Sequence, residues 1–200
     1  MSLQERMKED RVHSRNIEIF TCLSNGEGVI VQGTLKDDRL QQHYNIEGRL
    51  MDPFTVHHMI IRMLVSDKLV IEEIEAEMPG IPREECPETI KSLDRIKGWK
   101  IAPGFTEKVK EEIGGTAGCV HLSALLLAMA PAAVQGAWSC RSLQPINPAE
   151  GAFSPRLMEQ YLIDTCWVWR RDGARAKELM KMMEKENCVT INTFLILLPL

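Results

Sequence analysis

A glycine-rich segment that ends in a cysteine and a histidine is the part of the sequence best suited to chemistry. It reads GGTAGCVHL over residues 114–122, and its glycines allow the backbone to turn sharply into a helix. A thiol in the first turn of that helix lies near unpaired backbone N–H groups and the positive end of the helix dipole, which favour the thiolate. Cys119 is therefore a candidate nucleophile or metal ligand.

His121 offers an imidazole near the same helix start. A spacing of two residues does not place both side chains on one helical face, so they converge only if Cys119 precedes the regular helix. His121 would then act as the base for Cys119 or as a second metal ligand. The alternative is a small buried cysteine beside a histidine that bonds to a loop carbonyl.

Cys86 is a second thiol at a predicted helix start, directly before Pro87. The neighbouring Glu84, Glu85 and Glu88 oppose thiolate formation, which favours a metal ligand or a protonated thiol at this position. On the alternative interpretation these carboxylates only stabilise the start of the helix.

Two further residues are candidate ligands of the same site. His57 shares the strand parity of Met59 and Ile61 and is expected to face the core or the floor of a crevice, whereas His58 points to the opposite face. Cys166 is predicted on the inward stripe of a terminal helix, where helix packing is the alternative role.

Thiolate and imidazole ligands together suit zinc, iron or an iron–sulfur cluster. The sequence predicts Cys86, Cys119 and His121 as ligands, His57 as a fourth ligand or an outer hydrogen-bond donor, and Cys166 as an additional contributor. Without a metal, Cys119 becomes a sulfur-carrying or redox thiol. The alternative function is a noncatalytic interaction module with structural cysteines, whose terminal helix and apolar tail contact a protein partner or a second copy.

Charge and composition exclude several classes of protein. The chain has 24 basic and 28 acidic residues, a net charge of −4, so no general basic field attracts nucleic acid or anionic lipid. Residues 194–200, FLILLPL, are far shorter than the roughly 20 residues that span a bilayer. The first residues are highly charged and lack the apolar stretch of a secretory peptide, which predicts a cytoplasmic protein without a membrane contact.

Several familiar signatures are missing from the sequence. The six cysteines form no CxxC pair, so a metal site has to be assembled from distant segments, and reduced thiols are the expected state. The chain also lacks a Walker-type phosphate loop, a GxGxxG motif after a strand, a GxSxG elbow and an HExxH helix.

The first half of the chain is predicted to be rich in strands. Alternating polarity over residues 15–22 and 29–36, around an Asn-Gly turn, predicts a hairpin. Residues 39–53 are predicted to be a connection, and residues 55–65 and 69–78 predict a second hairpin.

Helices are predicted after Pro79. One begins at Pro87 and ends at Gly98, a second runs from Thr106 to the glycines at 114 and 115, and a third runs through residues 122–135 with a kink or break at Pro131. A long fourth helix is predicted from Ser154-Pro155 through Trp169, with an interruption at Asp172-Gly173 and a continuation over residues 174–186.

Strands followed by helices predict an α+β fold, in which an antiparallel sheet of about four strands is covered by helices from the C-terminal half. We expect one domain over residues 14–186, with residues 1–13 and 187–200 as terminal extensions.

The order of these segments resembles the bacterial family called domain of unknown function 2889. The resemblance runs from about Ser14 to about Leu179 and depends on RNIEI, VIVQGTLKD, VHHM, GWKIAPGF, GGTAGCVHL and LIDTCWVW. It implies that His57, Cys86, Cys119, His121 and Cys166 are the site positions, and it implies no reaction. Trp167 stands where many relatives have histidine.

The layout is also similar, more distantly, to iron–sulfur assembly proteins of the NifU, IscU and SufE types. In those families the corresponding thiols bind a cluster or zinc, or carry persulfide sulfur. The resemblance implies that Cys86 takes the first ligand position and that Cys119 with His121 takes the last. A CxxS-like neighbourhood is missing here.

Overall fold

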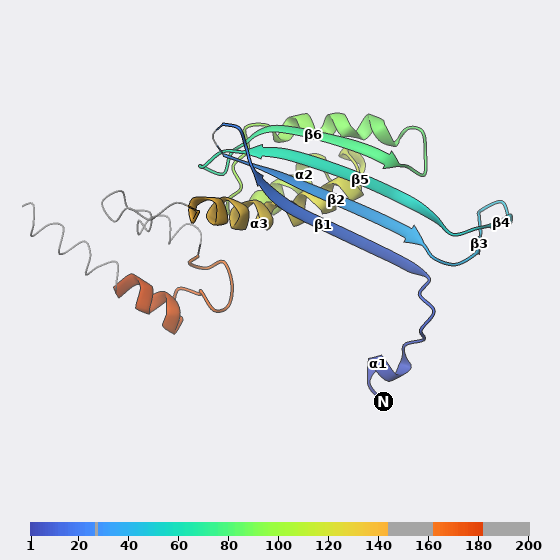
Figure 1. The fold of residues 1–200 in the computed structure, drawn as a ribbon, viewed down its shortest axis with the longest axis horizontal. Coiled ribbons are helices and arrows are strands. Elements are labelled where there is room, and N and C mark those ends of the chain that lie inside the picture. Colours follow the sequence, from blue (N-terminus) through green and yellow to red (C-terminus); the bar gives the residue numbers. More distant parts are fainter. Residues whose placement is uncertain (27, 144–161, 182–200) are drawn as a thin grey trace, which may run out of the picture. The chain divides into compact units, whose positions relative to one another are not determined.

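A computed structural model describes the chain except for residues 27, 144–161 and 182–200 (Figure 1). The chain divides into two compact units, residues 1–143 and 144–200. The predicted domain limits of residues 14 and 186 stay a prediction, because the second limit lies outside the described residues.

The first unit is built on a four-stranded antiparallel sheet. Its strands are β1 (His13–Leu23), β2 (Val29–Arg39), β5 (Phe54–Val65) and β6 (Ile71–Gly80), in the spatial order β1-β2-β5-β6 (Figure 1). The two predicted hairpins are β1–β2 and β5–β6. Within the predicted connection, β3 (His43–Tyr44) pairs with β4 (Leu50–Met51) as a small separate hairpin.

The helical segments follow the sheet in the chain, apart from the short α1 (Leu3–Arg6). They are η1 (Cys86–Ile96), α2 (Phe105–Ile113), η2 (Gly115–Ala117) and α3 (Val120–Arg141). The predicted helix at Pro87 is a 3₁₀ helix, and the next two predicted helices correspond to α2 and α3. The predicted α+β class and four-stranded sheet are confirmed.

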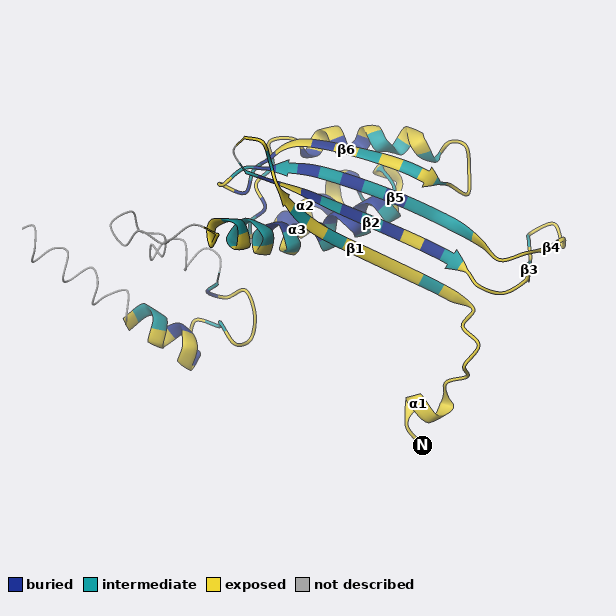
Figure 2. Ribbon diagram, in the orientation of Figure 1, coloured by how far each residue is buried: buried dark blue, intermediate teal, exposed yellow. Residues whose placement is uncertain are grey.

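The inner face of the sheet forms the core with α3. Alternate residues of β2 and β5 are buried, among them Val31, Leu35, Ile61 and Met63, and buried strand positions alternate with more exposed ones in Figure 2. The helix α3 packs against β1, β2 and β5. Its length and apolar composition alone would be enough to cross a bilayer, a property shared by the core helices of water-soluble folds.

No break occurs at Pro131, which lies inside α3. Leu125 and Met129 before the proline and Ala133 after it are all buried, whereas Pro131 itself is exposed. Packing on both sides of the proline holds the helix together, and the pyrrolidine ring is turned outward. Of the kink or break expected at Pro131, the break is therefore wrong, and the kink stays a prediction.

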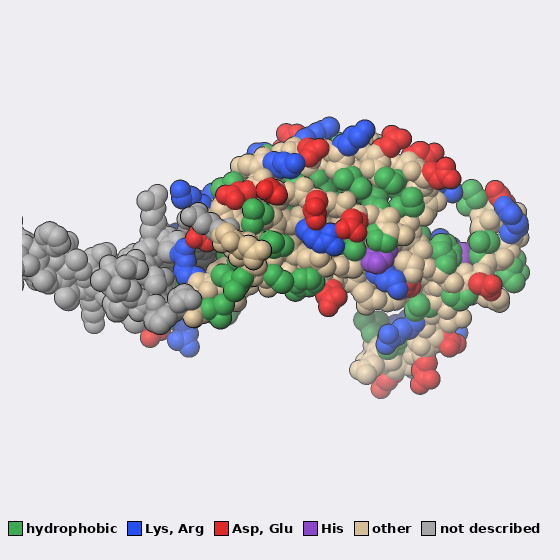
Figure 3. Space-filling view, turned by 45° about the horizontal axis from the view of Figure 1, so that its top comes forward, with side chains coloured by type: hydrophobic (Ala, Val, Ile, Leu, Met, Phe, Trp, Pro, Cys, Tyr) green, Lys and Arg blue, Asp and Glu red, His purple; other side chains and the backbone are tan. Residues whose placement is uncertain are grey.

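The outer face of the sheet is mixed in character. Arg62 of β5 lies beside Glu75 and Glu77 of β6, and it donates to Gln32 of β2. Acidic and basic side chains are interspersed with apolar ones on the face drawn in Figure 3. This face therefore presents no single sign of charge to a partner.

In the second unit, residues 162–173 form turns and residues 174–181 are helical. The predicted helix is wrong over residues 162–169. Asp164 has a positive φ of 61°, its N–H donates to the carbonyl of Trp169, and its carboxylate accepts from the N–H of Arg171. These bonds close a loop that is incompatible with a continuous helix. Ser154, Pro155 and the tail over residues 194–200 lie outside the described residues.

The close approach of α3 to β2 depends on Gly33. A Cβ atom added there would lie 2.6 Å from Met129 Sδ and 2.9 Å from Leu125 Cδ1. We expect Gly33→Ala to lower the free energy of unfolding by about 1–3 kcal/mol, because the core has no room for the added methyl group. Urea denaturation followed by circular dichroism measures this change.

Gly26 provides a matched control, because a Cβ atom at this position meets nothing within 4 Å and its φ is not positive. Gly26→Ala is expected to leave stability unchanged or to raise it by up to about 1 kcal/mol. Equal effects of the two substitutions would contradict the proposed packing of α3 on Gly33.

Candidate functional site

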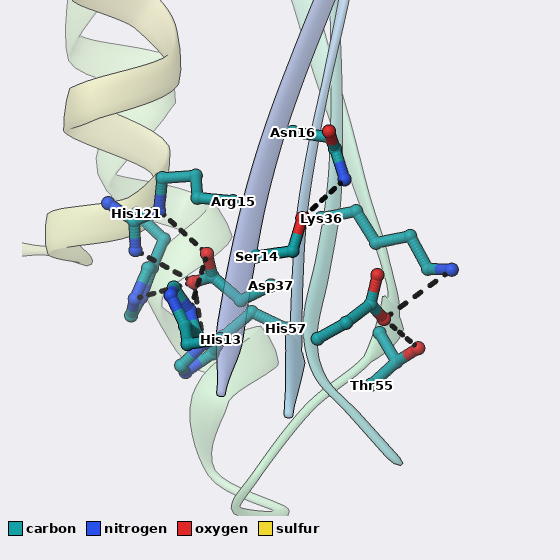
Figure 4. A network of polar contacts seen from close by, with 10 residues as sticks. His13, Ser14, Arg15, Asn16, Lys36, Asp37, Thr55, His57 and His121 are labelled. Atoms are coloured by element: carbon teal, nitrogen blue, oxygen red, sulfur yellow. Dashed lines mark hydrogen bonds and ion pairs between the residues drawn. The ribbon is translucent and has the colours of Figure 1, made fainter. Parts of the chain in front are cut away.

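The inner face of the sheet changes from apolar to polar at one end. The buried row of β2 ends in Asp37, and the inward row of β5 ends in His57, directly opposite Asp37 in the register of the two strands. His57 therefore lies on the inward face, as its parity with Met59 predicted. The two side chains lie within hydrogen-bonding distance, 3.1 Å from His57 Nδ1 to Asp37 Oδ2 (Figure 4).

The start of α3 brings His121 to the same place. Ser123 anchors this end of the helix, because its hydroxyl donates to the carbonyl of Ile113 at the end of α2. His121 Nε2 lies 3.6 Å from Asp37 Oδ2, and its ring stacks on that of His57 with centroids 3.7 Å apart (Figure 4). One carboxylate oxygen thus faces two imidazoles from different elements.

Cys119 precedes the regular helix, as its convergence with His121 requires. It is the N-cap residue of α3 and has an extended backbone. Its Sγ lies 3.8 Å from His121 Nδ1, the ring nitrogen on the other side from the one that faces Asp37. Cys119, His121 and Asp37 are therefore aligned as thiol, imidazole and carboxylate.

A bidentate ion pair holds the buried carboxylate in place. Arg15 of β1 donates from Nε to Asp37 Oδ1 and from Nη2 to Oδ2, both over 2.7 Å. Asp37 is only 2% exposed, so its charge requires such a partner. His13, two residues earlier on β1, places Nε2 3.6 Å from Oδ1.

These contacts set the protonation states of the site. The hydrogen bonds from Arg15 lower the pKa of Asp37, against an opposing effect of burial. Burial lowers the pKa of His121, and the nearby His57 lowers it further, although the charge of Asp37 acts in the opposite direction. The site therefore favours an ionised carboxylate beside a neutral His121.

A metal ion fits the donor atoms that meet here. Among the described residues, one ligand atom each from Asp37, His57 and His121 lie within 4.8 Å of one another. Two ligands about 2.0–2.1 Å from a tetrahedral zinc ion are about 3.3 Å apart. The distances of 3.1 and 3.6 Å from Asp37 Oδ2 to the two imidazole nitrogens bracket this value.

Of the other two cysteines expected at the site, Cys86 is not among these ligand atoms and Cys166 belongs to the second unit. Cys86 begins η1 as predicted, is half-buried, and its carbonyl accepts a hydrogen bond from Thr89. Cys166 is exposed in the turns before residue 174. The structure thus brings together His57, His121 and Cys119 of the five expected residues.

Asp37, Arg15 and His13 were not among the site residues predicted from the sequence. Asp37 continues the inward parity of Val31 and Leu35, so a carboxylate on an otherwise apolar face was the available signal. The predicted strand ended one residue too early to include it. Arg15 lies opposite Asp37 in the register of β1 and β2, which only the turn geometry could have specified.

The lowered pKa of His121 predicts how the stability of the metal-free protein depends on pH. The unfolded chain takes up this proton at about pH 6.5, whereas the folded protein resists it, so stability falls as the pH drops below about 6.5. The lowered pKa of Asp37 makes its contribution present above about pH 3.9 and lost as the pH falls through its folded pKa.

We expect His121→Gln to remove the fall in stability below about pH 6.5. Urea denaturation in the presence of a chelator, between about pH 7.5 and about pH 5, compares the variant with the wild type. Parallel stability curves for the two proteins over this interval would show that His121 is not the group responsible.

Comparisons with known proteins identify the family. No curated protein and no solved structure matches the chain. The layout similarity to NifU, IscU and SufE proteins is accordingly not supported by these comparisons. Residues 13–135, which include Asp37, His57, Cys119 and His121, match the family described as protein of unknown function (DUF2889), and the chain belongs to that family.

Proposed function

We propose that the protein binds a single transition-metal ion, zinc or iron(II), through Asp37 Oδ2, His57 Nδ1 and His121 Nε2. The observation that carries this proposal is the convergence of one carboxylate oxygen and two imidazole nitrogens from β2, β5 and the start of α3. The geometry favours a mononuclear ion over an iron–sulfur cluster. Clusters are held mainly by several thiolates, whereas among the described residues one thiol, that of Cys119, lies beside this group, in contact with His121.

One carboxylate oxygen and two imidazole nitrogens are typical ligands of catalytic metal ions. Two histidines and a carboxylate hold catalytic zinc in several hydrolases and iron(II) in oxygenases, and they leave coordination positions open for water or substrate. A bound ion of this kind polarises a substrate oxygen or lowers the pKa of a bound water molecule. The protein positions the ion at the end of the sheet, where Arg15 and His13 are partly exposed.

Cys119 acts through His121 in this proposal. When Nε2 binds the ion, Nδ1 carries the proton of the ring and donates it toward Sγ, 3.8 Å away. Such an outer partner fixes the tautomer and the orientation of a metal-binding histidine. Cys86 and Cys166, which the sequence predicted as ligands, are not part of the proposed set.

Metal binding is tested by a matched pair of substitutions on β5. His57→Gln removes a proposed ligand, whereas His58→Gln changes the next residue, which is paired with Lys36 and Gly80 on the outer face. We expect His57→Gln to weaken zinc binding by more than about 100-fold, because loss of an outer partner alone costs 10–100-fold.

Competition with a chromophoric chelator measures the affinity, and elemental analysis of the purified protein measures the bound metal. His58→Gln should retain the wild-type affinity. Similar zinc affinity in the wild type and His57→Gln would exclude the proposed ion site.

A reactive thiol at Cys119 is the second candidate function, which the alignment of Cys119, His121 and Asp37 favours. His121 Nδ1 would accept the thiol proton, and Asp37 would stabilise the resulting imidazolium. As a sulfur carrier, the Cys119 thiolate would attack the outer sulfur of a donor persulfide, forming a Cys119 persulfide and releasing the donor thiolate. This thiol function requires a reduced cysteine, which suits the cytoplasm.

Alkylation of the metal-free protein by iodoacetamide tests the thiol function. Cys22 is exposed, whereas Cys119 is half-buried, so access alone favours reaction at Cys22. If His121 activates Cys119, Cys119 should react about 10-fold faster than Cys22, and His121→Gln should abolish the difference. Peptide mass spectrometry resolves the two sites. Faster reaction at Cys22 in the wild type would argue against activation.

A further inference from the structure

The ion proposed above would leave the site with excess positive charge. The charge of Arg15 cancels that of Asp37, and neutral imidazoles contribute no charge as ligands. A divalent ion would therefore give the cluster of Arg15, Asp37, His57 and His121 a net charge of about +2. A partly buried charge of this size requires an anionic partner.

The nearest acidic side chain does not supply this partner. Asp38 follows Asp37 on β2, but its carboxylate accepts from Thr55 and lies beside Lys36. Figure 4 shows Thr55 and Lys36 on the side of the strand away from His57 and His121. Among the described residues, Asp37 is the carboxylate recorded within ion-pair distance of Arg15, His13, His57 and His121. The compensating anion therefore has to come from outside this cluster.

The edge strand β1 provides donors on the open side of the site. The side chain of Arg15 is 42% exposed and that of His13 is 51% exposed, whereas Asp37, His57 and His121 are mostly covered. Arg15 uses Nε and Nη2 in its bidentate ion pair with Asp37, which leaves Nη1 outside that pair. His13 and Arg15 lie on the same side of the strand, next to the carboxylate (Figure 4).

We propose that the metal-loaded site binds a small oxyanion, a carboxylate or phosphate group, with one oxygen on the ion and another between Arg15 Nη1 and His13. This inference rests on the proposed metal site and names the class of ligand it takes. The oxyanion replaces water at an open coordination position. It also completes the charge balance, and the guanidinium suits it because arginine recognises planar and tetrahedral oxyanions alike.

Cobalt(II) provides a probe that does not depend on activity, because its visible absorption responds to a change of ligand. The full-length protein is loaded with cobalt(II) and titrated with acetate, with methyl phosphate and, as a control for ionic strength, with chloride. We expect at least one of the two oxyanions to change the spectrum saturably, and the one that does so assigns the ligand class. Chloride at the same ionic strength should have a weaker effect.

Arg15→Gln should weaken oxyanion binding at least about 10-fold, because it removes a charge-assisted hydrogen bond. Because Arg15 also positions Asp37, oxyanion affinity is measured at saturating cobalt(II), so that a loss of cobalt affinity does not enter the comparison. A purely structural role for Arg15 would weaken cobalt binding and leave the oxyanion affinity of the cobalt-loaded protein unchanged. His13→Gln should weaken oxyanion binding several-fold and leave the carboxylate pair intact.

Arg62→Gln is the matched control, because Arg62 pairs with Glu75 and Glu77 on the outer face. If Arg15→Gln does not fold, Arg15→Lys and His13→Gln carry the test. Failure of the wild type to bind cobalt would overturn the metal site itself. Bound cobalt without an oxyanion response, or with equal oxyanion affinity in the wild type and these variants, would overturn only the present inference.

Discussion

The paired charges of Arg15 and Asp37 determine the character of this end of the fold. A carboxylate that is 2% exposed is unstable without a partner, and Arg15 supplies two short hydrogen bonds from the adjacent strand. Because the two residues are opposite each other in the register, a slip of one residue between β1 and β2 would turn Arg15 to the outer face. The register that sets Ile17 opposite Leu35 and Ile19 opposite Gly33 therefore also places the guanidinium at the site.

The second constraint is the path of α3, which is fixed by contacts at both ends of the helix. The missing side chain of Gly33 lets the helix lie close to β2, and that of Gly136 on the helix lets it lie close to Thr21 of β1. The hydroxyl of Ser123 bonds the first turn of the helix to the end of α2. His121 is thereby held over the edge of the apolar core, where its ring stacks on His57. A rigid helix that is anchored at both ends is a more accurate support for a ligand than a loop would be.

Most of the sheet could be predicted from the alternation of polar and apolar residues. The alternation over β2 and β5 reflects the burial of one face of the sheet against α3. The parity of His57 could be predicted from this alternation, and a helix start near Cys119 could be predicted from the glycines before it. The partners of His57 and His121 could not, because Asp37 and Arg15 reach the site through strand register and helix docking, which are long-range properties. The helix predicted around Cys166 shows the opposite error, since the loop closed by Asp164 overrode a helical pattern there.

The geometry of the carboxylate also limits which ions this site can hold. Each carboxylate oxygen has about two acceptor positions, and Arg15 uses one on each. Oδ2 keeps one acceptor position directed toward His57 and His121, whereas Oδ1 faces His13, so an ion held by the two imidazoles meets this carboxylate through Oδ2. Calcium, which needs six to eight oxygen ligands, is poorly served by one oxygen and two imidazoles. Zinc and iron(II) accept this set readily, and the bidentate ion pair of Arg15 thus selects for the same ions that the imidazoles favour.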